Sequence, residues 1–219
     1  MACHPLQRLK IDRIHVAPRA LELSPVGTQQ RYRDVWHLLN DVAARLRALP
    51  VGLVRFWLNL TSGHVVLTHM LPRYERGEWS LGRSVLRNVA CIRVSDLTQG
   101  SLDAWVPLGH LLDHLMGTGG SPDGPWLSDG GGINQALQAV GDRVAGLFPL
   151  GYGFDEAARQ DVRGYFARSL ALYLQDRRAL NVADPHMEKL LRATVLSEAF
   201  WRSHQIQAPA NPTGTSRSA

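Results

Sequence analysis

Few cysteines, few lysines and the absence of a long apolar run set the first limits on this chain. Its 219 residues contain two cysteines, Cys3 and Cys91, which are too few for a disulfide framework and indicate a reducing compartment. An apolar stretch such as residues 51–60 is interrupted by Arg55, whereas a membrane helix needs about 20 apolar residues. The N-terminus has no apolar signal-peptide core. We therefore expect a cytoplasmic protein with no membrane partner.

The remaining composition is that of an ordinary globular protein. Hydrophobic residues make up 45% and charged residues 20% of the chain, which excludes collagen, a coiled coil and wholesale disorder. Since a domain typically contains about 100–200 residues, the length predicts one compact domain. Such a domain is large enough to bury a sizeable core.

Positive charge is concentrated in the first hundred residues. The net charge is 24 − 19 = +5, and residues 1–100 hold 14 Lys and Arg against 7 Asp and Glu. A basic half favours a nucleic acid or an acidic protein as partner, although genomic base composition also produces a chain rich in arginine and poor in lysine. The arginines that form a candidate basic patch for phosphates, or else an ordinary solvated surface, are Arg73, Arg76, Arg83, Arg87 and Arg93.

Hydrophobic periodicity divides the chain into a strand-rich and a helical part. Period-two alternation predicts strands and spacings of three and four predict helices. The expected elements of residues 1–100 are a strand over 9–16, a long helix over 28–49, a hairpin of strands over 53–60 and 64–71, and a strand over 85–94. Residues 73–83 are polar and are not expected to form a strand.

Residues 101–206 are expected to be helical. Ser101 or Asp103 can cap a helix that ends near residue 116, and Asp155 and Asp184 can cap later helices. Another helix is expected over residues 133–148. The tail, residues 207–219, is rich in Pro, Ser and Thr and is predicted to be disordered. The fold class expected is α+β, with a small mixed sheet in the N-terminal half packed on helices and a helical C-terminal half.

The predicted helix that ends near residue 116 carries a pair of histidines. His110 and His114 are four residues apart, so both lie on one helical face and can chelate a divalent metal. With Asp113 they look like the inverted zinc motif His-x-x-Glu-His in which Asp replaces Glu. The alternative is a pair of ordinary histidines, one of them buried. In the loop that follows, Trp126 is a candidate to hold the loop over a cleft.

Two segments resemble zincin metallopeptidases of the anthrax-lethal-factor-like kind. Residues 108–115 read Leu-Gly-His-Leu-Leu-Asp-His-Leu, which matches the second half of the family's active-site helix. Residues 164–174, beginning Gly-Tyr-Phe-Ala-Arg-Ser, resemble the later helix that supplies the third zinc ligand. The resemblance covers roughly residues 88–201 and implies a zincin-like fold.

The residues that would perform the peptidase chemistry are missing. With His110 placed as the second histidine of the family motif, the first histidine falls on Val106 and the general-base glutamate on Pro107. The third ligand falls on Gly164 and a following glutamate on Arg168. A catalytic zinc needs about three protein ligands and a base for its water. The resemblance therefore implies an inactive peptidase, with no catalytic residues and no zinc.

Three functions remain open. The first is a pseudoenzyme that acts as a binding or regulatory module, with a protein or peptide laid along an edge strand of the former cleft. The second is a metal-dependent hydrolase in which zinc is held by His110, His114 and a third ligand such as Asp155, Glu156 or Asp161. The third is a nucleic-acid-binding protein that uses the arginine-rich N-terminal half. The residues expected to line the cleft are Val106, Pro107, Asp113, Gly164 and Arg168.

Overall fold

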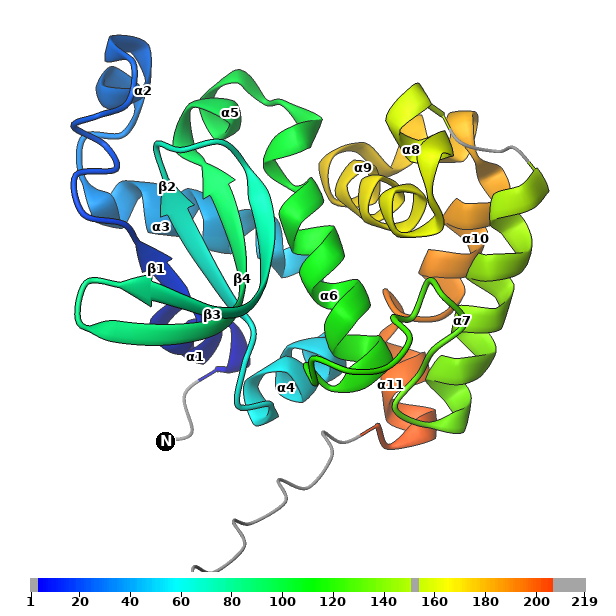
Figure 1. The fold of residues 1–219 in the computed structure, drawn as a ribbon. Coiled ribbons are helices and arrows are strands. Elements are labelled where there is room, and N and C mark those ends of the chain that lie inside the picture. The colour runs from blue at the N-terminus through cyan, green and yellow to red at the C-terminus, as the bar shows by residue number, and fades with distance from the viewer. Residues whose placement is uncertain (1–3, 151–153, 207–219) are drawn as a thin grey trace, which may run out of the picture.

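The computed structural model describes residues 4–150 and 154–206 and has the expected α+β class. A mixed sheet lies in the N-terminal half, and helices make up the C-terminal half (Figure 1). The predicted tail, residues 207–219, lies outside the described residues. The α-helices are α1 (Pro5–Asp12), α2 (Val26–Arg31), α3 (Val35–Arg45), α4 (Val51–Asn59), α5 (Val94–Gln99), α6 (Val106–Thr118), α7 (Gln135–Leu147), α8 (Glu156–Gln160), α9 (Val162–Ala183), α10 (Pro185–Ala193) and α11 (Glu198–His204).

The sheet has the strand order β1-β2-β4-β3. Strands β1 (Ile14–Val16), β2 (His64–Thr68) and β4 (Ser84–Arg93) are parallel, and β3 (Arg73–Leu81) runs antiparallel to β4. Because β3 pairs with β4 alone, it forms one edge of the sheet.

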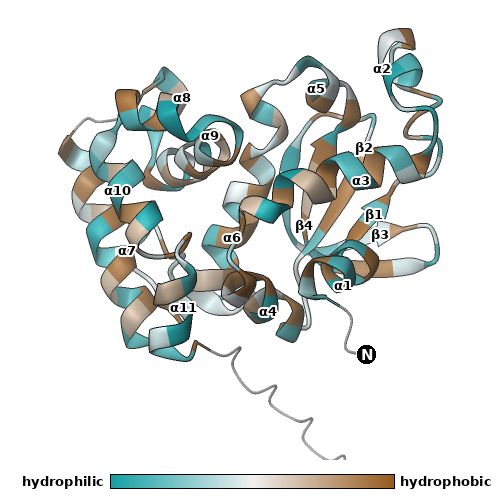
Figure 2. Ribbon diagram, turned by 180° about the vertical axis from the view of Figure 1, so that it is seen from behind, coloured by the Kyte–Doolittle hydropathy of each residue, from teal (hydrophilic) through white to brown (hydrophobic). Residues whose placement is uncertain are grey.

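One hydrophobic core joins the two halves. It contains the inward side chains of β2 and β4, such as Val65 and Ile92, and extends from Leu9 in α1 to Ile206 after α11. Helix α6 lies between the sheet and the C-terminal helices (Figure 1). Helices α1 and α3 lie in front of the sheet in the view from behind (Figure 2). Within the described residues, no helix is both long and apolar enough to cross a bilayer.

The prediction of a strand over residues 9–16 is wrong for most of its length. Pro5 starts helix α1, where the side chain of His4 accepts a hydrogen bond from the amide of Leu6. Leu6 and Leu9 then face the core together, and only the last three residues of the predicted strand form β1. The helix cap and the burial of two leucines three residues apart stabilise a helix here more than the short alternation of apolar and polar residues favours a strand.

The expected long helix over residues 28–49 is two helices. Tyr32 has an extended backbone, and Asp34 caps α3 by accepting a hydrogen bond of 2.7 Å from the amide of His37. Thr28 lies inside α2 instead of capping a helix. The 3-10 turn η1 (Leu46–Ala48) then ends the segment before Pro50.

The expected hairpin is wrong in its first strand, because residues 53–59 fall in helix α4, while the second strand, expected over 64–71, is confirmed as β2. Leu53, Phe56 and Trp57 are buried together on one face of this helix. The guanidinium of Arg13 donates a hydrogen bond of 3.3 Å to the carbonyl oxygen of Leu58, which lies in the last turn of α4 and has no partner within the helix. An apolar run of eight residues is ambiguous between strand and helix, and here tertiary packing decides.

The polar segment 73–83, which was not expected to form a strand, contains the edge strand β3. The strand over residues 85–94 is confirmed as β4, as are the helices near residues 104–116 and 133–148, as α6 and α7. The caps Asp155 and Asp184 are confirmed as well. The two last expected helices are each divided, the first at Asp161, which caps α9, and the second after α10.

Candidate functional site

A cleft of about 970 Å³ lies between the edge strand β3, the start of α6 and the start of α9. It is open to one side and has both apolar and charged walls. The residues that line it are Leu71, Pro72, Arg73, Tyr74, Arg93, Asp96, Gln99, Ser101, Asp103, Val106, Pro107, His110, Trp126, Asp129, Asp161, Val162 and Arg163.

The first turns of α6 place two of the predicted cleft residues beside His110, which was predicted as a metal ligand. Val106, Pro107 and His110 all line the cleft, and Pro107 occupies the first turn, where its missing N–H costs no helical hydrogen bond. Gly109, directly before His110, touches α9, because a Cβ at this position would lie 2.5 Å from the carbonyl oxygen of Ala167. Close helix contact therefore fixes where α6 stands relative to α9.

Both ring nitrogens of His114 are occupied by hydrogen bonds. Nε2 lies 2.7 Å from the carbonyl oxygen of Ser121, and Nδ1 lies 2.6 Å from the hydroxyl of Tyr74. A carbonyl only accepts, so Nε2 carries the proton and Nδ1 accepts from Tyr74. Burial lowers the pKa of His114, which favours this neutral form.

Asp113 is fully buried and fastens the loop between α6 and α7. Its carboxylate accepts from the amide of Ser128 at 2.8 Å and from the hydroxyl of Ser128 at 2.6 Å. Burial raises the pKa of Asp113 to about 7, against the opposing effect of these two hydrogen bonds. Asp113 thus lies under the loop and does not line the cleft, in contrast to the prediction.

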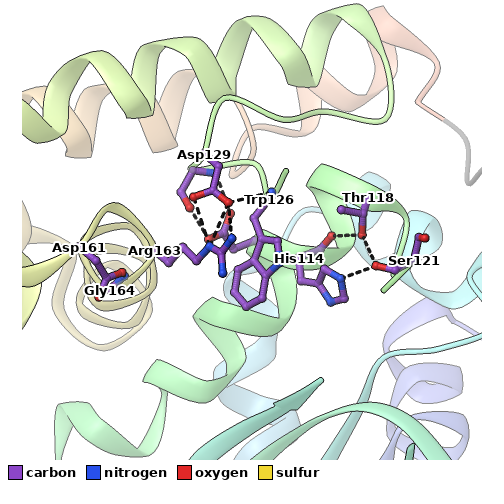
Figure 3. Close-up of polar contacts among 10 residues, drawn as sticks. His114, Thr118, Ser121, Trp126, Asp129, Asp161, Arg163 and Gly164 are labelled. Atoms are coloured by element: carbon purple, nitrogen blue, oxygen red, sulfur yellow. Dashed lines mark hydrogen bonds and ion pairs between the residues drawn. The ribbon is translucent and has the colours of Figure 1, made fainter. Parts of the chain in front are cut away.

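Trp126 forms the inner wall of the cleft, as its candidate role in the loop suggested. Its ring stacks on His114 with 5.0 Å between centroids, and the guanidinium of Arg163 lies 4.3 Å from its centroid on the side of α9 (Figure 3). Arg163 in turn makes ion pairs with Asp129, the shortest at 2.6 Å. The aromatic and ionic contacts together hold the loop against α6 and α9.

His110 differs from His114, because within the described residues its ring has no hydrogen-bond partner. Its ring centroid lies 6.1 Å from that of Trp126. Burial lowers the pKa of His110, and the nearby Asp161 opposes this effect. His110 is therefore a neutral imidazole at the cleft with both nitrogens free for a ligand.

The two predicted residues on α9 have structural roles. The amide of Gly164 donates to the capping carboxylate of Asp161 at 2.7 Å. Arg168 makes ion pairs with Asp103 at 2.9 Å and Asp155 at 2.7 Å, which connect α9 to the 3-10 turn η2 (Leu102–Ala104) and to the start of α8. Neither residue lines the cleft.

The catalytic zinc ion of the zincin metallopeptidases does not fit the residues at these positions. Val106, Pro107 and Gly164 have no side-chain donor for a metal. Residues 4–150 and 154–206 contain no group of three or more His, Cys, Asp or Glu side chains placed to hold one. Metal binding by His110 and His114 stays a prediction, and it requires that His114 give up a hydrogen bond to Tyr74 or to Ser121.

The arginines of the candidate basic patch are largely neutralised. Arg73 pairs with Glu75, Arg87 with Glu78 and Arg93 with Asp96. In the part of the chain that the structure describes, Arg76 and Arg83 have no carboxylate partner. Arg73 and Arg93 lie in the cleft wall, while Arg83 lies in the turn between β3 and β4.

Sequence reasoning missed Tyr74, Asp129 and Arg163 as residues of this site. Tyr74 and Asp129 belong to segments that were expected to be irregular, and Arg163 looked like one of many arginines. Comparison of the chain with family profiles, with curated proteins and with solved structures finds no significant match to any of them. The resemblance to zincins therefore rests on the residues of α6 and α9.

Proposed function

We propose that this protein is a catalytically inactive, zincin-like module that binds an extended peptide in the cleft between β3 and α6. The observation that carries the proposal is the chemistry at three positions. Val106, Pro107 and Gly164 stand where the resemblance puts two zinc ligands and the general base, and none has a suitable side chain. The cleft beside them is nevertheless well formed.

The edge strand β3 supplies the means of binding a peptide. Its backbone pairs with β4 on one side only, and an extended segment can add to the free edge by main-chain hydrogen bonds. The cleft is lined by the first two residues of β3, Arg73 and Tyr74. A peptide paired with this edge therefore passes over Val106 and Pro107.

The walls of the cleft favour an apolar side chain in the bound peptide. Leu71, Pro72, Val106, Pro107 and Val162 line the cleft with apolar atoms. Leu71 is 67% exposed at the rim, so a ligand that covers it removes apolar surface from water, at about 25 cal/mol per Å². The cleft also lies within the volume range of about 300–1,000 Å³ that ligand pockets occupy.

A displayed library of unstructured ten-residue peptides tests the proposal. We expect selected peptides to bind and to slow amide hydrogen exchange in residues 73–76. Val106→Gln, which places a polar amide in the cleft wall, should weaken their binding about tenfold or more, or about 1.4 kcal/mol. The matched control is Val182→Gln on α9, at a valine that is 85% exposed and does not line the cleft.

Three outcomes would overturn the proposal. Equal binding by the two glutamine variants, or exchange protection confined to other strands, would place the peptide elsewhere. Stoichiometric zinc in protein purified without chelator, combined with chelator-sensitive peptide hydrolysis that His110→Ala abolishes, would establish the metal-dependent hydrolase instead.

A further inference from the structure

The net positive charge of the molecule lies in the segment from α1 to α4. Residues 5–59 contain nine Lys and Arg and four Asp and Glu, so 9 − 4 = +5, while the rest of the chain balances at 15 − 15 = 0. Helices α1 and α3 of this segment lie on the outside of the sheet (Figure 2). Helix α1 and residues 33–47 together contain five Lys and Arg and three Asp and Glu, so this outer side carries 5 − 3 = +2 and favours an anionic partner.

A row of four exposed side chains lies on α3 and at its two ends. Trp36 and Asn40 are four residues apart and share one face of the helix, whereas Arg33 precedes the cap Asp34 and Arg47 lies in η1. Helix α3 has 11 residues and is about 16 Å long at 1.5 Å per residue. Among the described residues, neither Arg33 nor Arg47 has an ion-pair partner, in contrast to most arginines of β3 and β4.

Trp36 is the aromatic centre of this row. Its side chain is 69% exposed although it is large and apolar. Lys10 reaches across from α1, with its ammonium 5.6 Å from the centroid of the indole and 2.6 Å from Oδ1 of Asn40. The row thus gains a third cation, and the indole is supported on one side by the lysine.

We propose that α1 and α3 form a binding site for single-stranded nucleic acid. One base stacks on the indole of Trp36, and the phosphates on either side contact Arg33, Lys10 and Arg47. Aromatic platforms flanked by cations are how proteins bind single strands with little sequence preference. The amide hydrogens of Asn40 stay available for a base carbonyl, because its Oδ1 accepts the bond from Lys10.

An anionic membrane fits the same row less well. Binding at a bilayer interface depends on buried apolar area as well as on charge. Trp36 is the one large apolar side chain of the row, and the polar Asn40 follows it on the same face. A single aromatic ring with cations at both ends of its helix suits a strand of alternating bases and phosphates better.

Fluorescence anisotropy with labelled twelve-nucleotide oligouridylate and oligothymidylate tests the site. With three phosphate contacts, log K should fall against log salt concentration with a slope of about −2. Trp36→Ala should weaken binding about 5- to 150-fold, since stacking of one base is worth about 1–3 kcal/mol. Trp36→Phe keeps a ring and should retain most of the affinity.

Arg47→Ala should reduce the magnitude of the salt slope by about 0.7. The matched control is Arg143→Ala on α7, an exposed arginine outside this layer, which should leave the slope unchanged. Because the site is separate from the cleft, Val106→Gln should also leave oligonucleotide binding unchanged. If the protein does not bind oligonucleotides, the proposal that the cleft binds a peptide is therefore unaffected.

Trp36, Arg47 and Arg143 are exposed, so their variants should keep the wild-type circular dichroism spectrum. Absent or salt-independent binding of both oligonucleotides would overturn the proposal. So would binding that Trp36→Ala and Arg47→Ala leave at the wild-type level. Trp36-dependent binding to vesicles of 70% phosphatidylcholine and 30% phosphatidylserine, without oligonucleotide binding, would assign the row to membranes instead.

Discussion

At the level of single residues, Asp113 and His114 form buried hydrogen bonds that stabilise the loop after α6, a role that their spacing in the sequence does not indicate. The spacing of His110, Asp113 and His114 suggested a metal site, yet two of the three bond to the loop after α6. Asp113 bonds to Ser128 with both oxygens, and His114 bonds to the carbonyl of Ser121. The cleft wall at Trp126 depends on these bonds, because the loop carries that tryptophan.

Asp113→Asn should remove a pH dependence of stability. Because burial raises the pKa of Asp113 to about 7, the folded protein keeps a proton that the unfolded chain loses above about pH 4. The free energy of unfolding therefore falls as pH rises from about 4 to 7, by at most about 1.4 kcal/mol per pH unit for this group. In the variant, urea unfolding between pH 4.5 and 8 should show a flatter profile.

The asparagine can still accept the amide hydrogen bond of Ser128 and can donate to its hydroxyl, so the loop should stay in place. Asp123→Asn, at an exposed residue of the same loop, is the control and should follow the wild-type profile. A variant profile parallel to that of the wild type throughout this range would show that Asp113 does not titrate there.

At the scale of elements, the cleft depends on how closely α6 and α9 cross. Gly109 allows this crossing, because the backbone of Ala167 occupies the place of a side chain. The edge strand β3 forms the opposite wall, and its polar sequence reflects an edge that is partly solvated. Its existence depends on β4, which supplies the pairing partner.

Gly109→Ala should destabilise the protein by about 1–3 kcal/mol, because the new Cβ would lie 2.5 Å from the carbonyl oxygen of Ala167 and force the two helices apart. Alanine normally stabilises a helix relative to glycine. Gly146→Ala in α7, where a new Cβ meets nothing within 4 Å, should therefore stabilise it by up to about 1 kcal/mol. Chemical denaturation measures both changes, and the same sign in both variants would refute the close crossing.

At the scale of the whole molecule, the N-terminal and C-terminal halves share one core. Trp201 of α11 stacks on Phe56 of α4 with 5.4 Å between ring centroids, and its Cβ occupies the space beside Gly52. The amide of Gly52 also donates to the carboxylate of Glu198 at 3.0 Å. These contacts connect the last described helix to the first half of the chain.

Trp201→Ala should cost about 3–5 kcal/mol, the usual range for truncation of a buried tryptophan. Because the core is continuous, the two halves should still unfold together. Circular dichroism and tryptophan fluorescence should give coincident denaturation curves in the wild type and in the variant. Two separated transitions would show that the halves are independent domains.

Features that depend on neighbouring residues could be predicted from the amino-acid sequence. The caps Asp155 and Asp184, helices α6 and α7, strand β4 and the α+β class follow from local hydrogen bonding and hydrophobic periodicity. These interactions act within a few residues along the chain, so a single sequence suffices to predict them.

The other features could not be predicted, because they depend on contacts between residues that are distant in the sequence. Residues 53–59 form a helix because the core covers them and Arg13 bonds to its end, and β3 forms a strand because it pairs with β4. The roles of Arg73, Arg87, Arg93 and His114 likewise depend on which carboxylate, hydroxyl or carbonyl each side chain meets. Periodicity along the chain does not show which side chains meet, and these partners are known only once the chain is folded.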